Sequence, residues 1–194
     1  MELNFNFKGE RNYIQGPDVY NALLPLINQD SCKNFDLSFH QIMTQNILLS
    51  NEIPKNLEDL YFICKFQQSN IEQQIYGIKN IKSKPIQRYP YPEEQILENA
   101  KIDFNNKTIS LNKATNFSFM EEIIALNKFL LQTIIQKETP GKWYFSKLQT
   151  KRILKRSYPL MMQIKSNFNS LLVKSEIFTP DNGGGDFLFF GSKK

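Results

Sequence analysis

The sequence predicts an α+β fold in which two long helices are each wrapped by antiparallel strands. Two stretches, near residues 17–28 and 118–136, carry apolar residues at helical spacing. Several other stretches alternate apolar and polar residues, which is the period of a half-buried strand. The order strand, helix, long strand and hairpin occurs twice, so the chain is predicted to contain two similar halves.

The first half is predicted from its periodicity and its proline and glycine residues. In order, its elements are a strand at 3–7, a helix at 17–28, a long strand at 35–44, and a hairpin formed by 57–66 and 71–81. Pro25 lacks a backbone N–H and limits the helix, which is therefore expected to be short or kinked.

A proline-rich segment divides the two halves. Residues 82–93 hold three prolines and several charges, which is typical of a linker. The predicted organisation is therefore a first repeat at 1–81, a linker at 82–93 and a second repeat at 94–194, together forming one compact unit.

The second half follows the same plan. In order, its elements are short strands within 102–111, a helix at 119–136 ended by Pro140-Gly141, and strands at 143–154, 160–168, 171–178 and 187–190. The helix carries a wide apolar band, which is suited to burial against a sheet. The glycine-rich segment 180–185 is predicted to be a turn, because a strand and not a helix follows it.

A direct comparison supports the repeat. Residues 38–49, moved along by 106 positions, align with residues 144–155. The identical pairs are Phe39 with Phe145, Thr44 with Thr150, Ile47 with Ile153, and Leu48 with Leu154.

Composition bounds the class of protein. The chain has 194 residues, of which 41% are hydrophobic and 13% aromatic, and its net charge is +5. A domain of this size buries roughly 70% of its unfolded surface, and the aromatic content argues against disorder. The sequence shows no apolar run of about 20 residues and no signal-peptide pattern, so neither a membrane span nor export is expected.

Cysteine and histidine usage indicates a reduced compartment without a metal centre. Cys32 and Cys64 form no CxxC motif, so reduced thiols and a cytoplasmic location are expected. His40 is the single histidine, so a zinc site is not expected, and no cofactor is predicted.

The order of elements and one short motif resemble the hotdog-fold superfamily, in particular the bacterial 3-hydroxyacyl-carrier-protein dehydratases. The helix of that family opens with a glycine and places a catalytic acid five residues later in a Glu-Ala-Leu-like sequence. Here Gly16 and Ala22-Leu23 match, and Asn21 stands where the acid would be. Glu122 takes a comparable place in the second half. The resemblance implies a double hotdog that accommodates an acyl thioester.

His40, Glu122 and Asn21 are the candidate catalytic residues. Dehydrating a 3-hydroxyacyl thioester needs a base for the C2 proton and an acid for the departing hydroxyl, and His with Glu can fill both roles. Asn21 cannot transfer a proton at neutral pH but can orient a water or a carbonyl. The competing interpretations are a solvent-facing histidine, an acid that stabilises a helix dipole, and a surface amide.

Binding is assigned to a helix start and a basic run. Gly16 could present backbone N–H groups to a carbonyl oxygen. The basic run could dock an acidic carrier protein or a phosphate, and its members are Lys147, Lys151, Arg152, Lys155 and Arg156. It could equally be a solvated strand edge, where lysines discourage edge pairing. Nucleic acid is a third and less expected partner: a pI near 9.1 and the interleaved Tyr and Trp suit phosphate contact and base stacking, but +5 is modest and no nucleic-acid motif is present.

The predicted function is binding of an acyl thioester on acyl carrier protein or coenzyme A. The protein would be a diverged dehydratase or thioesterase of fatty-acid or polyketide-type metabolism. The alternative is a non-catalytic module that binds acyl chains or a protein. Whether the chain is an enzyme, and whether it forms a homo-oligomer, is left open by the sequence.

Overall fold

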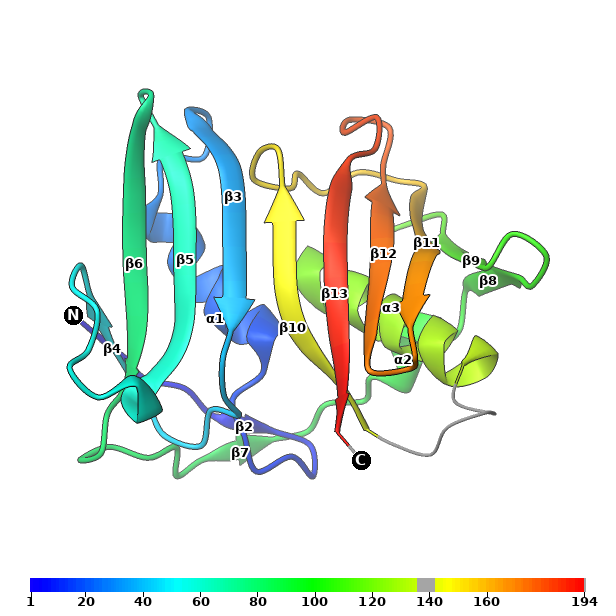
Figure 1. Cartoon of the computed structure of the whole chain (residues 1–194). Helices are drawn as coiled ribbons and strands as arrows, with labels where there is room; N and C mark the ends of the chain where they lie inside the picture. The colour runs from blue at the N-terminus through cyan, green and yellow to red at the C-terminus, as the bar shows by residue number, and fades with distance from the viewer. Residues whose placement is uncertain (136–141, 194) are drawn as a thin grey trace. The chain divides into compact units, whose positions relative to one another are not determined.

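The chain divides into two compact units. The computed structural model describes residues 1–135 and 142–193 (Figure 1). The first unit spans Met1–Pro92 and the second Glu93–Lys194. The boundary falls within the proline-rich segment 82–93, and each unit is described below by itself.

Antiparallel strands in the order β1-β4-β6-β5-β3 form the main sheet of the first unit (Figure 1). Their bounds are β1 Glu2–Leu3, β3 Cys32–Phe39, β4 Ile47–Ser50, β5 Leu60–Gln68 and β6 Ile71–Lys79. The remaining elements are the helix α1 (Gly16–Leu23), the short 3₁₀ turns η1 (Leu24–Leu26) and η2 (Leu57–Asp59), and a parallel pair formed by β2 (Phe7–Lys8) and β7 (Arg88–Tyr89). The segment expected to be a linker therefore contains a strand.

The first helix is shorter than predicted. The helix α1 ends at Leu23, and the chain continues as the 3₁₀ turn η1, which contains Pro25. Proline cannot donate to the carbonyl four residues before it, so an α-helix reaching residue 28 is not formed. The prediction of two long helices is therefore wrong for this unit, whereas the limiting effect of Pro25 is confirmed.

The long strand predicted at 35–44 is also divided. The strand β3 ends at Phe39, and the chain leaves the sheet before β4 begins at Ile47. The loop between them is held by Tyr61, whose hydroxyl accepts hydrogen bonds from the backbone N–H groups of Thr44 and Gln45, both at 3.2 Å. A side chain 16 or 17 residues further along the chain thus decides where this strand stops.

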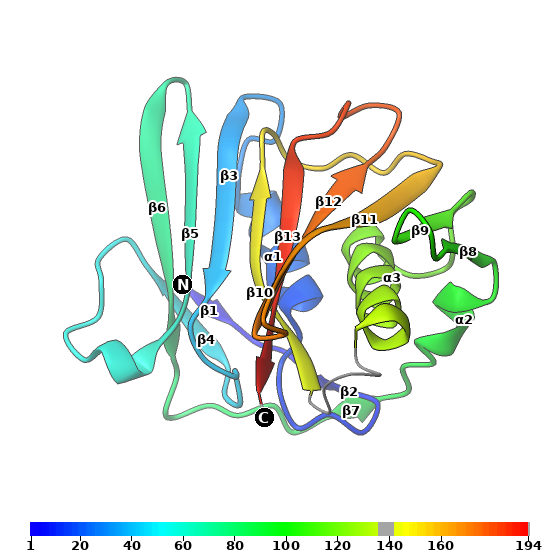
Figure 2. The same cartoon turned by 45° about the vertical axis from the view of Figure 1, so that its right-hand side comes forward.

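In the second unit, antiparallel strands pair in the order β10-β13-β12-β11-β9-β8. Their bounds are β8 Ala100–Asp103, β9 Thr108–Leu111, β10 Lys142–Thr150, β11 Leu160–Phe168, β12 Leu172–Phe178 and β13 Asp186–Lys193. The helices are α2 (Glu94–Leu97) and α3 (Phe119–Ile134). Figures 1 and 2 show α3 against one face of β11, β12 and β13.

The helix α3 is the long helix that the sequence predicted. It begins with a capping box, in which the Ser118 hydroxyl accepts from the Glu121 N–H and the Glu121 carboxylate accepts from the Ser118 N–H. Ile123 and Leu130 are fully buried. Phe129, expected in the core, is 36% exposed, because it lies about 100–120° around the helix from these residues. Ile134 is half-buried, and Pro140-Gly141 lies outside the described residues.

The strand predicted at 143–154 ends earlier. The strand β10 stops at Thr150, and residues 151–159 form a loop that leads into β11. The basic run therefore lies mostly on a loop and not on a strand edge. The turn predicted at 180–185 is confirmed between β12 and β13, where Gly183, Gly184 and Gly185 all have positive φ.

Taken unit by unit, the sheets are mostly antiparallel and the helices are few. The described helices include none that is long and apolar enough to cross a membrane.

Candidate functional site

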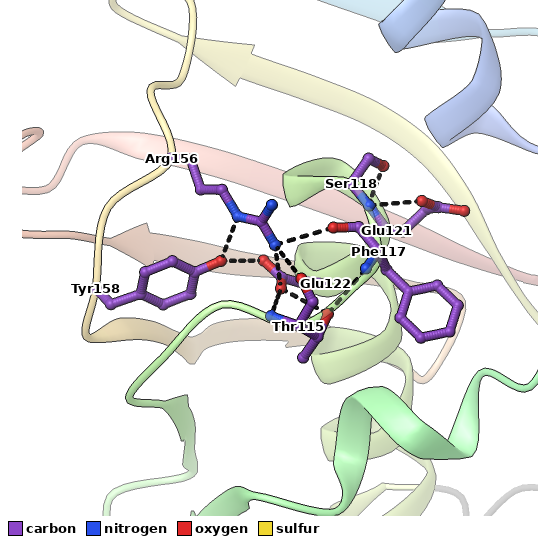
Figure 3. A network of polar contacts seen from close by, with 7 residues as sticks. All are labelled: Thr115, Phe117, Ser118, Glu121, Glu122, Arg156 and Tyr158. Atoms are coloured by element: carbon purple, nitrogen blue, oxygen red, sulfur yellow. Dashed lines mark hydrogen bonds and ion pairs between the residues drawn. The ribbon is translucent and has the colours of Figure 1, made fainter.

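Glu122 is the best-connected of the predicted site residues. It lies in the first turn of α3, directly after the capping box, and its side chain is 0% exposed. One carboxylate oxygen, Oε1, accepts hydrogen bonds from the Thr115 N–H and the Thr115 hydroxyl, both at 2.7 Å. The same oxygen is 2.7 Å from Nη2 of Arg156, and the other oxygen accepts a short hydrogen bond from the Tyr158 hydroxyl (Figure 3).

Arg156 joins the 151–159 loop to the start of α3. Its Nη2 also donates to the backbone carbonyls of Thr115 and Phe117, both at 2.9 Å, and its Nε donates to the Tyr158 oxygen at 2.7 Å (Figure 3). Burial acts to lower the pKa of Arg156, but its hydrogen bonds to Tyr158 and Glu122 outweigh burial and raise it. The guanidinium is therefore a permanent cation beside the buried carboxylate.

Tyr158 remains a neutral donor in this network. Burial, together with the hydrogen bond to Glu122, raises the pKa of Tyr158 to about 12. The ring also packs edge-on against Phe119, with the centroids 6.0 Å apart. The phenol is thus held both by its hydroxyl and by its ring.

Four donors occupy the Glu122 carboxylate. A carboxylate offers about four lone-pair positions. The Thr115 N–H, the Thr115 hydroxyl, Arg156 and Tyr158 supply four hydrogen bonds to them. Three of these bonds reach Oε1 and one reaches Oε2, so both oxygens of Glu122 already accept from donors of this unit. No group of three or more potential metal ligands occurs among the described residues.

His40 lies in the first unit, immediately after β3. Its side chain is exposed, and its backbone N–H donates to the Tyr61 carbonyl at 2.9 Å. The His40 side chain thus points into solvent, which agrees with the competing interpretation of a solvent-facing histidine.

Gly16 and Asn21 both lie in α1. The helix begins at Gly16, as the motif predicted, and both residues are half-buried. Asp18 in the first turn forms an ion pair with the ammonium of Lys8, and Lys8 is 3% exposed. Sequence reasoning missed Lys8, since a lysine in a two-residue strand gives no signal that it will be buried against an acid.

The basic run is divided among different tasks. Lys147 lies in β10, whereas Lys151, Arg152, Lys155 and Arg156 lie in the loop after it. Lys151 donates through Nζ to the Gly184 carbonyl at 2.8 Å, and Arg156 is bound to Glu122. The side chains of Arg152 and Lys155 are exposed. Lys151 and Arg156 are thus bound within the second unit.

Thr115 and Tyr158 complete the network but were not predicted. Thr115 precedes the helix cap by three residues, and Tyr158 follows Arg156 by two. The one sequence signal for these two residues was Glu122 itself. A carboxylate in the first turn of a buried helix needs hydrogen-bond donors from elsewhere in the chain.

Comparison with solved structures finds dehydratase domains. The dehydratase domain from the CurJ module of curacin polyketide synthase matches 100% of this chain and 86% of its own, at 9% identity and a TM-score of 0.43. The corresponding domain from the CurK module matches 91% and 78%, at 8% identity and a TM-score of 0.40. A structure described as a fusion DH domain matches 93% and 79%, at 9% identity and a TM-score of 0.43.

No protein-family model matches the sequence, and no curated protein matches it. The solved structures are dehydratase domains, the class that the sequence was predicted to resemble, and the likeness extends over most of the chain. At TM-scores below 0.5 it assigns no residue and no activity to this chain.

Proposed function

We propose that this chain is a dehydratase-like hotdog protein that binds an acyl thioester, carried by acyl carrier protein or coenzyme A, without converting it. The absence of turnover is inferred from the hydrogen bonds that the Glu122 carboxylate already accepts. Four hydrogen bonds, one of them from the Arg156 guanidinium, hold this carboxylate in the buried start of α3.

Dehydration would require more freedom at this residue. A general acid must hold a proton that it can release to the departing hydroxyl, and it must lie within hydrogen-bond reach of that hydroxyl. In Glu122, Oε1 accepts from Thr115 and Arg156 and Oε2 accepts from Tyr158, so a substrate hydroxyl would have to compete with donors of this unit. In this proposal the carboxylate fixes the helix start and takes no part in chemistry.

Acyl-thioester binding is supported by the sequence motif in the first unit. The helix α1 begins at Gly16 and contains Ala22 and Leu23, the positions on which the resemblance to the dehydratases depends. Asn21 replaces the acid of that motif, and an amide can donate a hydrogen bond to a thioester carbonyl without transferring a proton. Gly16 and Asn21 of the first unit are the residues proposed to contact the acyl thioester. Docking of an acidic carrier protein by the exposed cations Arg152 and Lys155 of the second unit is a separate proposal.

The test separates binding from turnover. Isothermal titration with a hydrolysis-resistant acyl-coenzyme A analogue, and with acyl carrier protein bearing the same chain, measures binding. Release of free thiol and formation of the enoyl product, followed with saturated and 3-hydroxyacyl thioesters, measure conversion. The proposal predicts saturable binding with no product above the buffer control.

Two results would overturn the proposal in different ways. If neither carrier binds, acyl-thioester recognition is wrong. If product forms, and is lost in Glu122→Gln or His40→Ala while unfolding is unchanged, the chain is an enzyme with the catalytic residues predicted from the sequence. Asn21→Leu removes the amide but keeps a side chain of similar size. This variant tests the binding site and should lower the affinity for the acyl thioester by several-fold.

A further inference from the structure

The outward face of the β11–β13 sheet has a composition unlike an ordinary solvated surface. On β12 and β13 the residues facing α3 are buried and apolar or small: Val173, Ser175, Ile177, Leu188 and Phe190 are at most 1% exposed. Because side chains alternate along a strand, the residues between them point to the other face. No described helix of this unit covers that face (Figures 1 and 2).

Aromatic rings and lysines are interleaved on this outward face. The strand β13 contributes Phe187 and Phe189, which the pairing register places opposite Glu176 and Lys174 of β12. The Lys174 ammonium lies 3.6 Å from the centroid of the Phe187 ring and 5.9 Å from that of Phe189. One cation is therefore shared by two rings.

A second pair of the same kind lies on the neighbouring strand. The Lys165 ammonium, from the bulge in β11, is 5.9 Å from the centroid of the Phe178 ring. It also forms an ion pair with Glu176 at 3.1 Å. The carboxylate of Glu176 additionally accepts from the Gly185 N–H at 2.7 Å, so the one acid among these outward residues of β11–β13 is already satisfied.

At the β11–β12 turn the same face carries an exposed aromatic ring, that of Phe168. Phe168 is 68% exposed and Leu172, its partner across the strands, is 42% exposed. Leu172 in turn lies opposite Gly191, which has no side chain. The turn is fixed to β13 by hydrogen bonds from Ser192 to the carbonyls of Ser170 and Leu171, at 2.5 and 2.9 Å. Phe168 is thus presented on a firmly held hairpin.

We propose that this face binds single-stranded nucleic acid. Proteins that bind single strands combine cations for the phosphates with rings on which unpaired bases stack, and sheet faces are well suited to this. Phe187 and Phe189 are two residues apart on one strand, hence about 6.7 Å apart, so each ring can take a separate base. Lys174 and Lys165 supply the positive charge beside those rings.

Binding would exchange one contact for another at each ring. Lys174, Phe187 and Phe189 are half-buried, and Lys165 is exposed. An ammonium over a ring that still touches solvent is held weakly, and a flexible lysine can swing from the ring to a phosphate. The vacated ring face then accepts a base.

The test uses the whole chain and a short fluorescent oligouridylate, with a duplex RNA as comparison. Fluorescence anisotropy is measured between about 50 and 200 mM salt, where phosphate contacts lose affinity steeply. The single strand should bind, and the duplex should bind at least about tenfold more weakly, because its bases are not free to stack.

Two variants divide stacking from charge. Phe187→Leu combined with Phe189→Leu keeps apolar side chains but removes both rings, and should weaken single-strand binding by at least about tenfold. Lys174→Gln should lower the salt slope by about one. Lys101→Gln, an exposed lysine on β8, is the matched charge control and should change affinity less than about twofold.

Several outcomes would overturn the proposal. These are the absence of single-strand binding, equal affinity for the duplex, or an unchanged affinity in the ring variant whose thermal unfolding matches the wild type. Binding of anionic vesicles that is lost in the ring variant, with no binding of oligouridylate, would show that the face serves a different partner. None of these results depends on acyl-thioester binding.

Discussion

Glu122 and Asp186 are two carboxylates buried in the same unit, but their partners differ. Glu122 is bound by a guanidinium, a phenol and the N–H and hydroxyl of Thr115. Asp186, which is 2% exposed, accepts from the Lys151 N–H at 2.8 Å and the Asn182 amide at 2.9 Å. The Lys151 ammonium itself donates to the Gly184 carbonyl.

The difference in partners appears in how burial is compensated. Burial raises the pKa of Asp186, and the hydrogen bonds from Lys151 and Asn182 only partly oppose that effect. Glu122 accepts four hydrogen bonds, and the one from Arg156 is also a direct ion pair. The comparison teaches that burial alone does not make an acid in this unit structural; the presence of a bound cation does.

The largest effect is expected for Glu122→Gln. The substitution keeps the size of the side chain but leaves Arg156 and Tyr158 without an anionic acceptor. We expect a loss of about 2–4 kcal/mol in the free energy of unfolding, less than for a fully buried pair because Arg156 is 39% exposed. Urea denaturation measures it, and Glu98→Gln, an exposed acid just after α2, should change stability by less than about 0.5 kcal/mol. A cost equal to that of the control would remove Glu122 from the structural network.

A smaller effect is expected for Tyr158→Phe. The ring contact with Phe119 is kept, and the Glu122 carboxylate loses one donor, so the cost should be about 1–2 kcal/mol at neutral pH. Because folding raises the pKa of Tyr158 from 10.0 to about 12, its contribution is fully present below pH 10 and is lost as pH rises through about 12. The stability difference between wild type and variant should therefore shrink across that window in urea titrations. A constant difference would contradict the hydrogen bond.

The expected effect of Asp186→Asn has a different pH dependence. Folding raises the pKa of Asp186, so its contribution is greatest below its ordinary value of 3.8 and declines as pH rises through the folded-state pKa. Wild type should thus lose stability relative to the variant as pH rises from about 3 towards neutrality, with a difference of about 1 kcal/mol or less at pH 7. Thermal unfolding at several pH values measures this. The opposite slope would mean that the hydrogen bonds from Lys151 and Asn182 outweigh the effect of burial on Asp186.

The smallest effect is expected for His40→Ala. The side chain is exposed, and the backbone hydrogen bond to Tyr61 is unaffected by the substitution. Stability should change by less than about 0.5 kcal/mol, and acyl-thioester affinity should be unchanged. Calorimetry of unfolding and of ligand binding checks the two statements. A loss of affinity would show that His40 contributes to the ligand site.

Sequence reasoning predicted well those elements that local signals define. The start of α3 follows from Ser118 and Glu121, and the turn between β12 and β13 follows from its glycines. The sequence-based prediction failed for features that depend on contacts between residues far apart in the sequence. The end of β3 depends on Tyr61, and the position of Phe129 depends on which side of α3 the sheet covers.

The site was predicted in part for the same reason. Glu122 was singled out as an acid at a helix start, but whether it is free or bound depends on Arg156, which lies 34 residues away in the sequence. Arg156 itself was grouped with four other cations as a docking surface. Only the folded loop shows that it turns inward to the helix (Figure 3).

A double-mutant cycle between Glu122 and Arg156 tests the central claim most directly. Urea unfolding is measured for Glu122→Gln, Arg156→Gln and the double variant. If the carboxylate is a structural anchor, the second substitution should cost little once the first is made, giving a coupling of about 1–3 kcal/mol. Effects that add within about 0.5 kcal/mol would show that Glu122 is independent of Arg156 and free to act on a substrate.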